Sequence, residues 1–496
     1  MKKNDIYVLN PYYHLRNDTR RILLFSKCQT DENSSNNWYT FIHPLQAIML
    51  SFFTYKRKLG ENIVLLSQYF HCTESEMEHY IIPFIENSDM LRTKWRGHEI
   101  VFPRNVLIKV PQNYVYLNIS SEKLVCKNLD LTSRRLYEAP LSITIMLTNR
   151  CVTHCCYCYA DTNTKVGIKL STKRICELIK EAGELGLKSV NLIGGEIFLH
   201  PDWALILKKT VDCNVATEYI STKIPLTQKI IDSLKWAGYK GIIQLSLDTL
   251  NNNIMKSLLK VNDDYLESVK RGIILLDRSG LKYQVSTVVT TYNCNSKIII
   301  ELYNFLSKLK NIVVWNVVPV HDTLHPKVDD FHILKPSYKD LDKLFLELDK
   351  LSKNSAISIA VDNYTINKKY YYSKGGSKDF EGNKCSALNT QFFILPDGKV
   401  SICEQLYWHP YFIIGDVTNN NLKSVWKSER ALYLYNKSYT DIRSQSKCFH
   451  CVLNRECFEY NNRCWSDIMK AYGKDNFDYP DPRCALAEEM LNNIGY

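Results

Sequence analysis

The sequence lacks any apolar run long enough to cross a membrane. Its longest apolar stretches, such as Asn311 to Val320, cover about ten residues, whereas a membrane-spanning helix needs about twenty. The first residues include two lysines but no apolar segment behind them, so we expect no signal peptide. With a mean hydropathy of −0.25, the chain is expected to be a soluble cytoplasmic protein without a membrane partner.

A strong charge bias is also missing. The net charge of +11 comes from 63 Lys and Arg against 52 Asp and Glu, and it is spread over 496 residues. Such a mild excess is compatible with an acidic peptide or with nucleic acid and does not separate the two. The length predicts about three domains at roughly 150 residues each, and a hydrophobic content of 45% is ample for their cores.

Cysteine, in contrast, is abundant and clustered. Of the 17 cysteines, four lie between positions 151 and 158, and seven lie from position 385 onward. Disulfides explain high counts in small secreted proteins, but a long chain without an export signal more often uses cysteine for metal or redox chemistry. The two clusters therefore mark two regions where metal binding is expected.

Residues 1–115 have the outline of a winged helix. Apolar segments at Ile6–Leu9 and Arg21–Phe25 predict strands. Pro44 stands at the start of a first predicted helix, where proline is favoured, and Ile63–Phe70 predicts a second. Strands followed by helices in this order suggest a small separate module.

A third helix and a hairpin complete this outline. The helix begins at Thr73, which forms a capping box with Glu76, and Lys94–Phe102 predicts a hairpin with Gly97 at its turn. In DNA-binding winged helices the third helix enters the groove. Here the segment from Thr73 to Arg92 holds five acidic residues and one arginine, a charge that phosphates would repel. We therefore expect a peptide-binding or structural module and do not expect nucleic acid as a partner.

Alternating strands and helices dominate the middle of the chain. Residues 116–138 are polar and are interpreted as a linker, and the alternation runs over residues 139–330. Repeated strand–helix units predict a parallel sheet curled into a partial barrel, with the chemistry at the C-terminal ends of its strands. Six strands are predicted, at Ser142–Thr148, Ser189–Ile193, Val215–Ile220, Gly241–Leu247, Lys282–Val289 and Ile312–Val317.

The last third of the chain is less regular. Residues 331–384 are interpreted as a bridge with one helix near Tyr338 to Leu351. Residues 385–496 are rich in cysteine and turn residues and show little periodicity. A segment of this kind usually needs metal to fold.

Three cysteines directly follow the first predicted barrel strand. The spacing of Cys151, Cys155 and Cys158 allows three thiolates to hold one corner of a cubane iron–sulfur cluster and leaves one iron open for a substrate. A structural zinc site would normally use paired CxxC elements and four ligands. Cys156 supplies a fourth thiol, but adjacent cysteines rarely both bind one ion. An iron–sulfur cluster with an open iron is therefore the preferred interpretation.

The second predicted strand ends in Gly194, Gly195 and Glu196. Two glycines allow the backbone to approach a ligand closely, and the carboxylate can pair with an ammonium group. A tight strand–helix turn would use the same residues without any ligand. The position of this triplet, one strand–helix unit after the three cysteines, favours the ligand-binding interpretation.

The segment CVTHCCYC, followed by GGE, resembles the radical S-adenosylmethionine (radical SAM) superfamily. The family signature is CxxxCxΦC with an aromatic residue at Φ, here Tyr157. The resemblance implies an α/β fold with a partial (β/α)6 TIM-like barrel, and a [4Fe-4S] cluster at the three cysteines whose open iron binds S-adenosyl-L-methionine. Reductive cleavage of this cofactor yields a 5′-deoxyadenosyl radical that abstracts a hydrogen atom. The family usually has proline after the glutamate, where this chain has Ile197.

The same resemblance implies further cofactor contacts at strand ends. Similar positions in the family contact the ribose and methionine parts of S-adenosylmethionine. Each residue alone could equally be an ordinary polar cap. The residues implied in cofactor binding are Tyr157, Gly194, Gly195, Glu196, Ser221, Thr222, Ser246 and Asp248.

The C-terminal cysteines resemble the SPASM domain, the auxiliary-cluster module of radical enzymes that modify peptides and proteins. The resemblance implies two clusters of the [4Fe-4S] type, one at Cys448, Cys451, Cys457 and Cys484, and a second at Cys385, Cys403 and Cys464. Six residues separate Cys457 from Cys464, where the family has three, and no fourth cysteine is available for the second cluster. That cluster would have an open iron or a non-cysteine ligand; zinc ribbons are the alternative for the C-x2-C element.

Together these resemblances imply a peptide maturase. Residues 1–115 would capture the leader of a ribosomally made precursor peptide as an added edge strand. The barrel would then oxidise or crosslink its core through a thioether or carbon–carbon bond, with a flavodoxin- or ferredoxin-like electron donor. An anaerobic sulfatase-maturase-like enzyme forming formylglycine is the enzymatic alternative. A non-catalytic, cluster-bearing regulator that binds peptide or DNA is the alternative of another class. No general base is evident.

Overall fold

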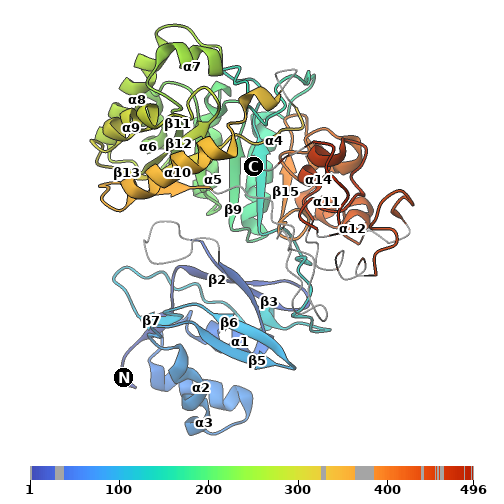
Figure 1. Cartoon of the computed structure of the whole chain (residues 1–496). Helices are drawn as coiled ribbons and strands as arrows, with labels where there is room; N and C mark the ends of the chain where they lie inside the picture. The colour runs from blue at the N-terminus through green and yellow to red at the C-terminus, as the bar shows by residue number, and fades with distance from the viewer. Residues whose placement is uncertain are drawn as a thin grey trace. The chain divides into compact units, whose positions relative to one another are not determined.

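The computed structural model divides into two compact units, Met1–Ala139 and Pro140–Tyr496 (Figure 1). The structure describes residues 3–27, 38–325, 331–362, 385–436, 441–452, 454, 457, 463–484, 486–492 and 494. In these residues, no helix combines the length and the apolar character that a membrane span requires.

The first unit contains a three-stranded antiparallel sheet of β2 (Tyr13–Asn17), β3 (Ile22–Ser26) and β4 (Tyr39–Ile42), with β3 in the centre. A second ladder pairs β1 (Tyr7–Leu9) with β7 (Leu107–Lys109). The sequence predicts β1 and β3, but not β2 or β4. All five residues of β3 are buried, which gives it a clear apolar signal, whereas only two of the five residues of β2 are buried.

Three helices follow, as predicted: α1 (Pro44–Phe52), α2 (Leu59–Phe70) and α3 (Glu74–Ile81). The capping box of α3 is confirmed, because the Thr73 hydroxyl accepts from the amide of Glu76 at 3.2 Å and the Glu76 carboxylate accepts from the amide of Thr73 at 2.9 Å. The hairpin of β5 (Leu91–Trp95) and β6 (His98–Phe102) also forms. Its two turn residues, Arg96 and Gly97, both have positive φ, at 46° and 79°, as a tight hairpin turn requires.

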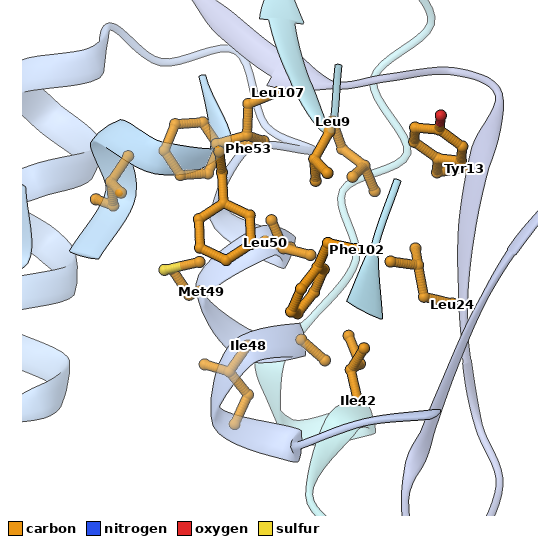
Figure 2. Close-up of a cluster of buried hydrophobic side chains, with 14 of the residues drawn as sticks. Leu9, Tyr13, Leu24, Ile42, Ile48, Met49, Leu50, Phe53, Phe102 and Leu107 are labelled. Carbon is orange, nitrogen blue, oxygen red and sulfur yellow. The ribbon is translucent and has the colours of Figure 1, made fainter. Parts of the chain in front are cut away.

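Helix α1 packs its apolar side chains against the strands. Figure 2 shows Leu50 and Phe53 of this helix segment among Leu9, Leu24 and Phe102 from the strands. All five side chains are at most 1% exposed. This contiguous core explains why the first unit is compact by itself.

Residues 116–138 are part of the first unit, so their interpretation as a linker needs correction. Leu131 and Leu136 are buried. The buried Arg21 of the β2–β3 turn donates to the carbonyl of Arg135 at 2.7 Å, and Asp18 accepts from the amides of Tyr137 and Glu138 at 2.8 and 2.9 Å. This segment shows no helical or strand period because side chains, rather than a backbone ladder, hold it in place.

The second unit contains the partial barrel that the sequence predicts (Figure 1). Strands β10 to β14 form a parallel sheet, and β8 pairs in parallel with β9. Helices connect successive strands, as expected of strand–helix units. The strands are β8 (Ser142–Met146), β9 (Ser189–Ile193), β10 (Tyr219–Thr222), β11 (Ile242–Ser246), β12 (Tyr283–Val289), β13 (Ile312–Pro319) and β14 (Ile359–Val361). The helices are α4 (Thr172–Glu184), α5 (Trp203–Asp212), α6 (Gln228–Trp236), α7 (Asn252–Leu259), α8 (Tyr265–Ser279), α9 (Ser296–Leu306) and α10 (Tyr338–Ser352).

The third barrel strand starts later than the sequence predicts. Val215 is buried, but it lies before the strand, with its amide bonded to the carbonyl of Thr210 of α5 at 2.9 Å. The strand proper begins at Tyr219. The strand also ends later than predicted, at Thr222, so that Ser221 and Thr222 lie within β10 and do not follow it.

The C-terminal region has more regular structure than the sequence suggests. Strands β15 (Gln391–Ile394), β16 (Lys399–Ser401) and β17 (Ile413–Asp416) extend the barrel sheet, because β15 pairs in parallel with β8. Gly398, in the turn between β15 and β16, has a φ of 88°, which only glycine adopts readily. Three helices follow in the described residues: α11 (Leu422–Trp426), α12 (Glu429–Tyr435) and α14 (Trp465–Tyr472).

Candidate cofactor and cluster sites

The loop after β8 holds Cys151, Cys155 and Cys158 at the C-terminal end of the first barrel strand. The Thr153 hydroxyl lies 3.5 Å from the sulfur of Cys151 and 3.1 Å from that of Cys155. The amide of Cys158 donates to the carbonyl of Cys155 at 3.2 Å. The predicted cluster ligands are therefore neighbours in one compact loop.

The end of α7 supports this loop from outside. The amides of His154 and Cys156 donate to the carbonyls of Leu259 and Leu258, each at 2.9 Å. Burial raises the pKa of Cys155 to about 11. The assignment of the ligand role to Cys151, Cys155 and Cys158, without Cys156, stays a prediction.

The two glycines before Glu196 allow close packing between backbones. A Cβ atom on Gly195 would lie 2.4 Å from the carbonyl oxygen of Arg150, and one on Gly194 would lie 2.9 Å from that of Thr148. The amides of Gly195 and Glu196 donate to these same carbonyls at 2.7 and 2.8 Å. The glycines thus attach the end of β9 to the segment that leads directly into Cys151.

Glu196 is buried, at 1% exposure, and its carboxylate is surrounded by donors. It accepts from the Thr222 hydroxyl at 2.9 Å and from the amides of Lys223 and Ile224 at 3.0 and 3.2 Å. It also accepts from the amide of Phe198 at 3.3 Å. These bonds show a structural role in joining the ends of β9 and β10, while its contact with the cofactor ammonium group stays a prediction.

A hydrogen-bonded chain of side chains adjoins the cysteine loop. The hydroxyl of Tyr157 donates to the carboxylate of Asp248, and the ammonium group of Lys223 donates to the Tyr157 oxygen at 3.1 Å. Asp248 also accepts from the amide of Val288 at 2.9 Å. Two residues predicted to bind the cofactor, Tyr157 and Asp248, are therefore in direct contact. Lys223, which the sequence did not indicate, contacts Tyr157.

The remaining predicted cofactor residues lie on neighbouring strand ends. Thr222 and Ser246 line a small pocket together with Lys223 and with Gly272 of α8. Ser221 is exposed and accepts from the side-chain amide of Gln244 at 3.1 Å. The structure thus places Thr222 and Ser246 at one pocket, and the roles of all of these residues in cofactor binding stay predictions.

Cys385, Cys403 and Cys464 lie near one another in the C-terminal region. The negative charge of Cys385 contributes to raised pKa values of both other thiols, behind the larger effect of burial, which raises the pKa of Cys403 to about 12. Cys464 occupies the cap position of α14. The side-chain oxygen of Gln405 accepts from Ser466 and Lys470 of that helix at 2.7 and 2.8 Å.

The other four cysteines form a second group. Burial and the charges of Cys448 and Cys451 raise the pKa of Cys484 to about 11. Cys457 is half-buried, and the charges of Cys448 and Cys484 act on it. The sulfur of Cys484 accepts from the amide of Leu486 at 3.4 Å, a bond that supports thiolate character.

The donor chemistry at these three places fits iron–sulfur clusters. Each group consists of buried or half-buried thiols, the ligands that iron–sulfur clusters use. In the residues that the structure describes, no three metal-binding side chains lie close enough together to hold a single ion. The assignment of individual ligands therefore rests on spacing and grouping, and it stays a prediction.

A carboxylate that the sequence did not indicate, Glu404, acts on several tyrosines of this unit. The charge of Glu404 is the largest cause of the raised pKa of Tyr159, and it acts, after burial, on Tyr407 and Tyr219. The charges of Cys158 and Cys403 also raise the pKa of Tyr407. Only the position of Glu404, directly after a predicted cluster ligand, could have drawn attention to it.

Comparisons with known proteins agree with this arrangement. Residues 145–306 match the family model of the Radical SAM superfamily, and residues 385–452 match that of SPASM, an iron-sulfur cluster-binding domain. A probable GTP 3′,8-cyclase of Methanothermobacter thermautotrophicus is 25% identical over 271 residues, which cover 53% of this chain and 84% of that protein.

Solved structures show the same fold over most of the chain. Streptococcus suis SuiB bound to precursor peptide SuiA has a TM-score of 0.65 at 17% identity, and SuiB bound to S-adenosylmethionine has 0.63 at 18%. Both comparisons cover 97% of this chain and 100% of the other. The two family models, together with the clustered cysteines, identify S-adenosylmethionine and iron–sulfur clusters as the cofactors of this protein. Residues 145–306 belong to the radical SAM superfamily, and residues 385–452 belong to the SPASM domain family.

Proposed function

We propose that this chain is a peptide maturase that crosslinks or oxidises side chains of a ribosomally synthesised precursor peptide. The observation that carries the proposal is the first unit of 139 residues. The fold shared with SuiB covers 97% of the chain and so includes this unit, and one of the SuiB structures contains a precursor peptide. The cyclase relatives match only about half of the chain.

The first unit offers a structure suited to capturing a peptide. Its three-stranded sheet has edge strands β2 and β4, and α3 and the β5–β6 hairpin follow. An extended leader peptide can add to such an edge through its backbone, with side chains supplying specificity. The acidic first turn of α3, with Glu74 and Glu76, favours a peptide over a nucleic acid.

The barrel site supports a hydrogen-abstraction reaction on the captured peptide. When bound, S-adenosylmethionine and the [4Fe-4S] cluster supply a 5′-deoxyadenosyl radical, at the cost of one electron from an external flavodoxin- or ferredoxin-like donor. Glu196, Gly194 and Gly195 fix the segment around Cys151 in which this chemistry would begin. The contact between Tyr157 and Asp248 supports Lys223, which lines the small pocket at the strand ends.

The peptide must lose two hydrogen atoms for each new crosslink. The 5′-deoxyadenosyl radical would take up one of them as a hydrogen atom and become 5′-deoxyadenosine, and the other would leave as a proton and an electron. Glu404, whose charge acts on Tyr159 and Tyr407, would accept the proton. Clusters at the C-terminal cysteines, when bound, would take up the electron and pass it to an external acceptor.

The test is anaerobic co-expression with the short peptide encoded nearest to the gene, followed by mass spectrometry. A mass loss of two hydrogen atoms per modification, absent with Cys151→Ala, would support the proposal, and fragmentation would locate the bond. An unchanged peptide with a fully cluster-loaded enzyme would count against it. A sulfatase-type peptide converted to formylglycine would favour the alternative, and failure to cleave S-adenosylmethionine would favour a regulator.

A further inference from the structure

Lys223 is held in a fixed position at the C-terminal end of β10. Its amide donates to the carboxylate of Glu196 at 3.0 Å, and its carbonyl accepts from the hydroxyl of Tyr265. Both contacts use backbone atoms, so they are independent of the side chain at this position. The direction in which the side chain leaves the backbone is therefore set by the barrel.

The side chain extends toward the cysteine loop. Its ammonium group donates to the hydroxyl oxygen of Tyr157 at 3.1 Å and lies 5.3 Å from the centre of that ring. Tyr157 stands next to Cys158 in the sequence and donates in turn to Asp248. Tyr157 thus anchors the ammonium group at the loop that contains the predicted cluster ligands.

The strongest charges acting on Lys223 are all negative. Burial lowers its pKa, but the charges of Cys155, Asp248, Cys158 and Cys151 raise it above the ordinary value. All three predicted cluster ligands are in this group. A cation in a partly buried pocket beside three thiolates interacts with them more strongly than it would in water.

We propose that Lys223 places a fixed positive charge beside the cluster held by Cys151, Cys155 and Cys158 and thereby raises its reduction potential. Reduction adds one negative charge to the cluster, and a nearby ammonium group stabilises this added charge. The proposal rests on the cluster site and not on the identity of the peptide. Its test needs no peptide, so its failure is distinguishable from failure of the proposed function.

The test compares potentials of full-length, anaerobically reconstituted variants. Lys223→Met and Lys223→Gln remove the charge, and Lys223→Arg keeps it. Lys229→Met, at an exposed position on α6, removes a charge elsewhere. The cluster is followed by EPR during redox titration without S-adenosylmethionine. Its signal is identified as the one that changes when S-adenosylmethionine is added, and iron and sulfide contents confirm equal loading.

Both neutral variants are expected to lower the ratio of reduced to oxidised cluster about tenfold at a fixed ambient potential, which equals about 59 mV for a one-electron couple. Lys223→Arg and Lys229→Met should leave the potential unchanged. An unaltered potential in either fully loaded neutral variant would overturn the proposal. Weaker binding of S-adenosylmethionine at an unaltered potential would also overturn it, because that result would make Lys223 a cofactor contact only.

Discussion

The hydroxyl of Thr222 lies 2.9 Å from both carboxylate oxygens of Glu196, so that the end of β10 is bonded to the end of β9. The family resemblance implies only that both residues contact the cofactor, whereas the structure shows that they bond directly to each other. Because the same carboxylate also binds the amides of Lys223 and Ile224, Glu196 organises the loop after β10 through bonds within the protein.

Replacing Glu196 with alanine should therefore damage the apoprotein as well as cofactor binding. The Thr222 hydroxyl and two or more amides would lose their acceptor, which should cost about 2–4 kcal/mol of folding free energy. Thermal unfolding of the cluster-free chain measures this loss. The exposed Glu184 of α4 serves as a matched control through Glu184→Ala, and equal melting of both variants would contradict the structural role.

Gly195→Ala should disrupt the cysteine loop. Its Cβ would lie 2.4 Å from the carbonyl oxygen of Arg150, so the backbone must move at a cost of about 1–3 kcal/mol. We expect most of the iron at this site to be lost. Gly167→Ala is the matched control, because nothing lies within 4 Å of a Cβ there. Iron content per chain is the measurement, and full loading of Gly195→Ala would refute the packing argument.

Glu404→Gln should separate cofactor cleavage from peptide modification. The amide cannot accept the proton that the peptide loses, so product formation should fall about 100-fold or more. Formation of 5′-deoxyadenosine should continue. The ratio of modified peptide to 5′-deoxyadenosine measures this uncoupling, and Glu404→Asp should retain part of the coupling. A wild-type ratio in Glu404→Gln would rule out this carboxylate as the acceptor.

The first unit should lose stability in mild acid. Burial lowers the pKa of His14, which lies against Phe25 across the β2–β3 ladder, from 6.5 to about 4. The unfolded chain then binds the proton more readily than the folded chain, so stability is full above pH 6.5 and decreases as the pH falls toward 4. The loss should be about 1–3 kcal/mol. Thermal midpoints of cluster-free wild type and His14→Gln at pH 7 and 4.5 test this, and an equal decrease in both would disprove it.

Local features of the site were predictable from the sequence, and long-range neighbours were not. The spacing of Cys151, Cys155 and Cys158 and the capping box at Thr73 depend on residues only a few positions apart, so their signal is contained in a short segment. Lys223 contacts Tyr157 of the cysteine loop, and Glu404 acts on Tyr159, only because the chain is folded, and no short pattern marks either residue.

The fold follows the same division. Fully apolar strands such as β3 were found because burial on both faces leaves a continuous apolar run. The start of β10 was misplaced because the buried Val215 belongs to the connection between α5 and β10, and β15 was missed because its partner β8 lies far away in the sequence.

The pairing of β15 with β8 has a consequence for biosynthesis. Strand β8 leaves the ribosome long before its neighbour, so one edge of the first barrel strand stays open until about 250 further residues, ending with Gln391–Ile394, have been made. An open edge of this kind invites wrong pairing. Barrel and SPASM domain must therefore mature together, and truncating the chain before residue 391 would leave the barrel itself unfinished.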